Sequence, residues 1–214
     1  RILINNGVDI KTTNEQGDTA LYLSVVAGDI PFLNFLIDLG ADLNFRNNEG
    51  KTALMMAVIS VNALEIVKLL LEKGANINIK DEDGGTALHH AVEYANSEIL
   101  EALLAKATKK DVDIQDSDGH TALYLAAVKG DVKKIQKLIE KNADLNIKDN
   151  GGKTVLHYAA EYENSEILEA LLAKAKDSLY FGIIDDILFE YETPASVPCL
   201  NERKRIIMPS EVYT

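Results

Sequence analysis

Three of the four histidines are the residues whose chemistry first suggests a metal or catalytic site. His89 and His90 are adjacent, and His157 recurs in a similar stretch of sequence. Imidazole binds zinc in company with cysteine or further histidine at short spacings, but no cysteine lies near these three. His89 and His157 each follow a threonine by three residues, and three other such places hold Tyr22, Met55 and Tyr124. A metal site could not tolerate that exchange, so we interpret the histidines as structural.

Two glycine pairs, Gly84-Gly85 and Gly151-Gly152, could cradle a phosphate group. Neither pair has the G-x-x-x-x-G-K-[ST] spacing or a preceding buried strand, so we expect both to form tight turns. Asp185 and Asp186 are adjacent carboxylates, and neighbours on a helix point about 100° apart, so they cannot easily share a site.

The single cysteine, Cys199, lies in a polar stretch without a nearby histidine, which does not favour a reactive thiol. The basic run Arg203–Arg205 is short, and we interpret it as a solvated surface. We therefore predict no catalytic, cofactor-binding or metal-binding residue, and a chain that is not an enzyme. A catalytic domain outside residues 1–214 is left open.

The elements that position these residues repeat along the chain. The matching threonines are Thr19, Thr52, Thr86, Thr121 and Thr154, with spacings of 33, 34, 35 and 33 residues. A fixed period of this size indicates a repeat architecture. Residues 116–148 form the reference unit.

The first half of the reference unit predicts a turn followed by a helix. Residues 116–119 read Asp-Ser-Asp-Gly, which is typical of a tight turn. Thr121 stands where a helix N-cap belongs, and the apolar stretch 122–128 contains small residues that let a neighbouring helix approach. Gly130 ends this helix.

The second half predicts an amphipathic helix capped by Asp131. Ile135, Leu138 and Ile139 recur at helical spacing, and Asn142 can take the left-handed conformation that ends the helix. We expect the polar side chains of this helix to point outward, namely those of Lys133, Lys134, Lys137 and Glu140.

This unit resembles the ankyrin repeat, with T-A-L at the start of its first helix and A-D-L-N after its second. The same pattern recurs in NEQGDTALYLSVVAGD, NNEGKTALMMAV, DEDGGTALHHAV and NGGKTVLHYAA. The resemblance implies an all-α solenoid of helix-turn-helix units with β-hairpin-like loops, in which His89 and His157 tie a threonine to neighbouring loops. The proline that usually follows the threonine is alanine or valine here. Since proline suits the first helical position, its absence lowers stability without threatening the fold.

The repeats divide the chain into an array and a C-terminal region. We predict an array over residues 1–176, with a partial unit at 1–13 and repeats at 14–46, 47–80, 81–115, 116–148 and 149–176. Repeat two has one extra residue near residues 60–62, and repeat three has two in residues 107–110. Insertions in loops are tolerated because loop-closure entropy grows slowly.

The C-terminal region predicts two further elements. Residues 177–192 read as an amphipathic helix that caps the stack, or alternatively as a helix that binds a partner. Residues 193–214 form a linker and then resemble, at Arg205–Val212, the opening of an F-box-like module of the kind that follows ankyrin arrays in PRANC proteins. Met208 departs from the leucine usual there.

Composition limits the partners that we expect. With 22 basic and 34 acidic residues, the net charge is −12, and an acidic surface repels phosphate backbones, so we expect no nucleic acid partner. No stretch reaches the roughly 18 apolar residues that span a bilayer, so we expect no membrane partner. One cysteine fits a reducing compartment. We expect a monomeric, intracellular, cytoplasmic protein whose natural N-terminus precedes Arg1.

The resemblance implies a concave groove lined by the loop tips and by the exposed side of each first helix. The helix positions on this groove include Val26 and Ile59. Tyrosine is a favoured interface anchor, although Tyr94 could instead pack on an adjacent repeat. The acidic residues at the middle of the groove favour a basic or mixed-charge protein partner. The residues predicted to bind it are Glu82, Asp83, Glu93, Tyr94, Asp118, His120, Val128, Lys129, Lys153, Glu161 and Tyr162.

Two functions follow as hypotheses. The first is a protein–protein interaction scaffold that binds its partner through the groove. The alternative is a substrate-recruiting adaptor arm of a ubiquitin ligase, in which the array captures a target and the F-box-like segment of residues 193–214 passes it on.

Overall fold

The protein is described by a computed structural model that places residues 9–161 and 165–176. Residues 1–174 form one compact unit, which contains nearly all of the described residues, and residues 175–214 form a second. The predicted capping helix at 177–192, the F-box-like segment at 193–214, Asp185, Asp186 and Cys199 lie outside the described residues.

The described helices occur in pairs. The five first helices, called inner helices below, are α2 (Ala20–Ala27), α4 (Ala53–Ala57), α6 (Ala87–Tyr94), α9 (Ala122–Lys129) and α11 (Val155–Glu161). The second, or outer, helices are α3 (Ile30–Asp38), α5 (Ala63–Glu72), α7 (Ser97–Lys106), α10 (Val132–Glu140) and α12 (Ser165–Lys176). A short additional helix, α8 (Lys109–Val112), follows α7.

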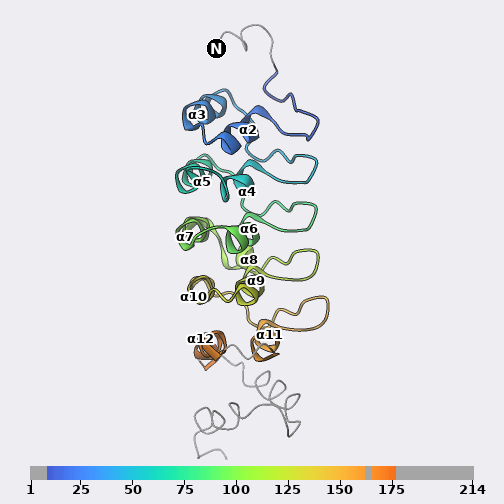
Figure 1. The fold of residues 1–214 in the computed structure, drawn as a ribbon, viewed down its shortest axis with the longest axis vertical. Helices are drawn as coiled ribbons and strands as arrows, with labels where there is room; N and C mark the ends of the chain where they lie inside the picture. Colours follow the sequence, from blue (N-terminus) through green and yellow to red (C-terminus); the bar gives the residue numbers. More distant parts are fainter. Residues whose placement is uncertain (1–8, 162–164, 177–214) are drawn as a thin grey trace, which may run out of the picture. The chain divides into compact units, whose positions relative to one another are not determined.

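The helix pairs stack into a solenoid, as the sequence predicts. Figure 1 shows the inner helices in one column, with the outer helices on one side and a column of loops on the other. Successive inner helices contact each other, α2 with α4, α4 with α6, α6 with α9 and α9 with α11. Within the described residues, extended pairing is limited to two isolated bridges, Thr13 with Thr19 and Gln115 with Thr121. The all-α solenoid is therefore confirmed.

Local side-chain hydrogen bonds start the helices where the sequence predicts. The Thr121 hydroxyl accepts a hydrogen bond from the main-chain N–H of Tyr124 at 3.2 Å, and Thr19 does the same for Tyr22. Asp131 caps α10 by accepting from the N–H of Lys134 at 3.1 Å. Each of these bonds satisfies a donor that the first turn of a helix leaves unpaired.

The loops form a ladder that runs from repeat to repeat. Each loop begins with an Asn or Asp whose side chain accepts main-chain N–H groups of the same loop, as Asp116 does for His120 at 2.8 Å. Consecutive loops are then joined through the main chain, from Ser117 N to the Asp83 carbonyl at 3.0 Å and from Asn150 N to the Asp118 carbonyl at 3.1 Å. This ladder fixes the spacing of neighbouring loops without a regular sheet.

In the loops of repeats one to four, the glycine is required by both conformation and space. Gly84 has φ +76°, and a Cβ built there would lie 2.6 Å from the main-chain nitrogen of Ser117 in the next loop. Only glycine combines positive φ with so close an approach. The glycine pairs at 84–85 and 151–152 thus lie in tight turns.

The core is a continuous apolar layer between inner and outer helices. Its members are almost fully shielded from solvent, and they include Leu21, Leu54, Leu88, Leu100, Leu103, Leu123, Ala126, Ile135 and Leu138. Burial of aliphatic side chains at this density is the main stabilising contribution.

The extra residues of repeats two and three take different forms. Between α4 and α5, Asn62 adopts a left-handed conformation with φ +58° directly before α5. After α7, residues around 107–110 enter α8, whose start is fixed by a 2.6 Å hydrogen bond from the main-chain N–H of Thr108 to the Asp111 carboxylate. The second insertion therefore forms a helical turn, because Thr108 and Asp111 have the spacing of a reciprocal cap.

One expectation about α10 is wrong. Lys134 does not point outward: it is buried, with 7% of its surface exposed, and its ammonium group donates to the Val92 carbonyl at 2.7 Å. Lys137 is partly covered and forms an ion pair with Glu101 of the preceding repeat. Both side chains turn toward the preceding repeat because it offers a carbonyl and a carboxylate to the cations. Lys133 and Glu140 are exposed as expected.

Candidate functional site

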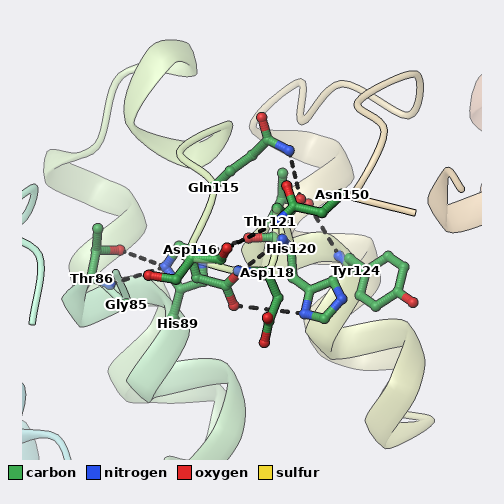
Figure 2. A network of polar contacts seen from close by, with 12 residues as sticks. Gly85, Thr86, His89, Gln115, Asp116, Asp118, His120, Thr121, Tyr124 and Asn150 are labelled. Atoms are coloured by element: carbon green, nitrogen blue, oxygen red, sulfur yellow. Dashed lines mark hydrogen bonds and ion pairs between the residues drawn. The ribbon is translucent and has the colours of Figure 1, made fainter. Parts of the chain in front are cut away.

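His89 connects its own helix start to the next loop. Its Nδ1 accepts from the main-chain N–H of Thr86 at 3.1 Å and lies 2.8 Å from the Thr86 hydroxyl, while its Nε2 lies 3.1 Å from the His120 carbonyl (Figure 2). Because the first contact needs a lone pair on Nδ1 and the carbonyl needs a donor, the ring is neutral with its proton on Nε2. Burial lowers the pKa of His89, which favours the same neutral form.

The other histidines of the first helices are also held by structural bonds. His90 Nε2 lies 2.6 Å from the buried carboxylate of Asp81, which starts the loop of the same repeat. His157 repeats the His89 arrangement, with its Nδ1 3.2 Å from the main-chain nitrogen of Thr154. Among the residues that the structure describes, no three side chains are arranged to hold a metal ion. The histidines therefore serve the joints between helices and loops.

Two ion pairs define the surface that faces the loops. Lys153, the residue before Thr154, lies 2.5 Å from Glu161, which is seven residues after that threonine. Lys129 on α9 lies 3.7 Å from Glu93 on α6. The seventh position of repeat five therefore lies on the same side as the loop residue before its threonine, and the seventh position of repeat three lies beside the eighth position of repeat four. We call this surface the inner face; its residues outside the loops are Val26, Ala27, Ile59, Ser60, Glu93, Tyr94, Val128, Lys129 and Glu161, of which Ile59 and Ser60 follow the end of α4.

Tyr94 and Val128 have exposed side chains on the inner face. Tyr94 is 59% exposed and stacks on His90 of its own helix, with ring centroids 6.0 Å apart. Partial burial and the neighbouring Glu93 carboxylate raise the pKa of Tyr94, so its phenol is neutral at physiological pH. Val128 is 42% exposed on α9. Tyr162 lies outside the described residues.

Most predicted charged residues are paired with each other or with a neighbour. Glu93 pairs with Lys129, Glu161 pairs with Lys153, and Glu82 pairs with Arg46 at 3.0 Å. Sequence reasoning did not select Arg46, whose signal is its place immediately before the next loop. These exposed pairs each contribute little to stability but reduce the negative charge of the inner face and the loops.

A smaller set of acidic residues has no cation nearby. Asp83 and Asp118 are exposed at the loop tips, and within the described chain neither forms an ion pair. Glu15 and Asp18 of the first loop likewise face no cation in that part of the chain; Asp18 accepts instead from the amides of Asn14 and Asn47. The loop column therefore keeps a net negative charge.

His120 is engaged in an aromatic stack. Its ring lies parallel to Tyr124 with centroids 4.3 Å apart (Figure 2). Tyr124 in turn meets Tyr158 of the next repeat, with ring centroids 5.3 Å apart. Its Nδ1 is 3.7 Å from the Asp116 carboxylate. His120 is thus half-buried and more tightly held than the other predicted residues.

The inner face also carries apolar side chains that the prediction placed there but did not select. Val26 and Ile59 are 46% and 53% exposed, and each stands seven residues after its threonine, as Val128 does. When the repeats are aligned in the sequence, this position holds an aliphatic residue in three of them. That recurrence is the signal that could have selected Val26 and Ile59.

Comparison with protein families agrees with the repeat geometry. The family described as "Ankyrin repeats (3 copies)" matches residues 1–81 and 88–179, and "Ankyrin repeats (many copies)" matches residues 61–104. The chain belongs to the ankyrin repeat family. As an ankyrin repeat protein it is a protein-interaction scaffold.

A solved structure is similar to this ankyrin repeat protein over most of its length. The matching chain comes from the complex of a predatory endopeptidase from Bdellovibrio bacteriovorus with an immunity protein. It is 32% identical, has a TM-score of 0.70, and the match covers 81% of this chain and 89% of that chain. No curated protein sequence shows significant similarity. Among the described residues, no helix has the length and apolar character that crossing a bilayer requires.

Proposed function

We propose that this ankyrin repeat chain acts as a monomer, without chemistry of its own, and binds a basic or mixed-charge protein through the inner face. The observation that carries the proposal is the exposure of Tyr94. Its aromatic side chain is 59% exposed on the inner face, whereas the apolar residues of the core are buried. Tyrosine offers a large contact area with few torsions to freeze, which suits an interface anchor.

The charges of the loop column support a basic partner. Asp83 and Asp118 are exposed at the loop tips and form no ion pair in the described part of the chain. A lysine or arginine of the partner could therefore pair with them without breaking an existing ion pair. Such charges increase the association rate and the specificity more than the affinity. The similar chain of known structure comes from a complex of two proteins, which is consistent with this kind of binding.

The test compares two single substitutions on the immobilised chain. Tyr94→Ala should weaken the binding of a captured protein and should leave the melting temperature nearly unchanged, because the ring is largely exposed. Lys133→Ala, at an exposed position of the outer helix α10, should change neither. Unfolding of Tyr94→Ala together with unchanged affinity would show that Tyr94 is a core residue and that binding occurs elsewhere.

A further inference from the structure

The inner face carries an apolar row with one contribution from each of four repeats. Val26, Ile59 and Val128 occupy the seventh position after the threonine in repeats one, two and four. In repeat three this position is Glu93, which is drawn to Lys129, and the adjacent Tyr94 supplies the exposed apolar surface instead. All four side chains are between 42% and 59% exposed.

The row runs across the inner helices rather than along any one of them. The helices that carry its residues, or in the case of Ile59 end just before it, contact one another in order, α2 with α4, α4 with α6 and α6 with α9 (Figure 1). Packed helices lie about 8–10 Å apart, so the apolar side chains recur at about that spacing. A partner that contacts each of them must present apolar groups with a matching repeat.

An α-helix comes close to this requirement, whereas an extended strand does not. Residues seven apart on a helix lie on the same side and are about 10.5 Å apart along its axis. On a strand, residues that share a face are about 6.6 Å or about 13 Å apart, and neither value fits the row. Four contacts would need a helix of about 22 residues, since three intervals of about 10.5 Å span about 31 Å.

The charges beside the row define the flank of that helix. Four cations of the loops and the inner face form ion pairs: Arg46 with Glu82, Lys51 with Glu49, Lys129 with Glu93 and Lys153 with Glu161. Glu15, Asp18, Asp83 and Asp118 face no cation within the described residues. A helix lying along the row would place one flank against these carboxylates, and lysine or arginine there would be favoured.

We propose that the inner face binds an amphipathic, basic α-helix of a protein partner that lies across the inner helices, with apolar side chains every seven residues in contact with Val26, Ile59, Tyr94 and Val128. This inference rests on the proposed function and specifies its partner. In this arrangement the row covers the apolar side of the bound helix, and the basic flank of the helix faces the loop tips.

The test uses two displayed peptide libraries of 22 residues each and does not depend on a known ligand. One library fixes apolar residues at every seventh position and randomises the rest; the other fixes alternating apolar residues for an extended chain. Selection on the folded protein should yield binders from the first library, enriched in lysine and arginine. Their affinity should fall with added salt, because the carboxylates are exposed.

Two matched substitutions locate the binding. Ile59→Glu places a charge in the row and should weaken a selected helix roughly tenfold or more. Phe32→Glu makes the same change at an apolar residue of similar exposure, 44%, on the outer helix α3, and should have no effect. Neither residue is in the core, so both variants should fold.

The outcomes separate this inference from the proposed function. Binders that come only from the alternating library, and that Ile59→Glu still weakens, would overturn the helical partner while leaving the inner face as the binding surface. Binders whose affinity is unchanged by Ile59→Glu, or that are enriched in aspartate and glutamate, would overturn the inference outright. If Tyr94→Ala also leaves captured proteins bound, the proposed function fails with it.

Discussion

The ammonium group of Lys134 donates a hydrogen bond to the main-chain carbonyl of Val92, 2.7 Å away in the preceding repeat. Val92 lies in the last turn of α6, where carbonyl groups have no partner within the helix. Helices α2 and α9 end in a left-handed glycine, Gly28 or Gly130, whereas α6 ends at Ala95 in an extended conformation. At the end of α6, Lys134 of the next repeat therefore donates a hydrogen bond to a last-turn carbonyl, as the N–H of the terminal glycine does in α2 and α9.

Lys134→Met should reduce the free energy of unfolding by about 1–3 kcal/mol. The substitution keeps the aliphatic stem and removes the donor, which leaves the buried Val92 carbonyl unpaired. Urea unfolding monitored by circular dichroism measures the loss. Lys133→Met, one residue earlier and exposed, is the control and should change stability by less than about 0.5 kcal/mol. Equal stability of both variants would mean that desolvation of the ammonium group offsets its hydrogen bond.

Leu123→Ala should cost about 2–5 kcal/mol, because Leu123 is fully enclosed in the core of repeat four and truncation leaves a cavity. Val128→Ala, on the same helix α9 but exposed, should cost less than about 0.5 kcal/mol. Denaturant unfolding compares the two. A loss at Leu123 no greater than the loss at Val128 would contradict the assignment of the inner and buried sides of α9.

Gly84→Ala and Gly152→Ala separate backbone strain from contact between repeats. Both glycines have positive φ, +76° and +82°, so alanine costs about 1–2 kcal/mol at either position. At Gly84 the added methyl group would also meet the Ser117 nitrogen at 2.6 Å, whereas at Gly152 no described atom lies within 4 Å. Thermal or urea unfolding should therefore show the larger loss for Gly84→Ala. Equal losses would mean that the next loop moves away from the added methyl group without a loss of stability.

Acid should weaken the protein partly through His89. Burial lowers the pKa of His89 in the folded state, while the unfolded value is about 6.5. As the pH falls through about 6.5, the unfolded chain takes up a proton that the folded His89 does not, so the free energy of unfolding decreases. Above that pH the contribution is fully present.

His89→Met provides the comparison, because Met55 holds the same place in repeat two and accepts from the Thr52 N–H through sulfur at 3.4 Å. The variant should lose less stability than the original chain between about pH 7.5 and pH 5. Urea unfolding at several pH values measures this. The charged neighbours of His89, namely His90, Asp81 and Asp116, are the same in both proteins. If the free energy of unfolding changes with pH in the same way in both proteins, His89 is not the source of the acid sensitivity.

The amino-acid sequence by itself determined the features that depend on neighbours along the chain. The period of the threonines, the capping by Thr121 and Asp131, and the left-handed Asn142 involve partners within a few residues, and the structure confirms them. The structural role of His89 was also readable, because the equivalent positions hold tyrosine or methionine. For Tyr94 the sequence left two interpretations open, an exposed side chain or one packed on an adjacent repeat, and the structure shows it 59% exposed.

The tertiary structure alone decided the contacts that join one repeat to the next. Lys134 looked like a solvated cation on an amphipathic helix, yet its partner is a carbonyl 42 residues away. The acidic residues Glu82 and Glu93 looked unpaired until Arg46 and Lys129 were placed beside them. The physical reason is the same in each case. Which cation reaches which acceptor depends on the stacking of the repeats, and that distance in space has no counterpart in the local sequence pattern.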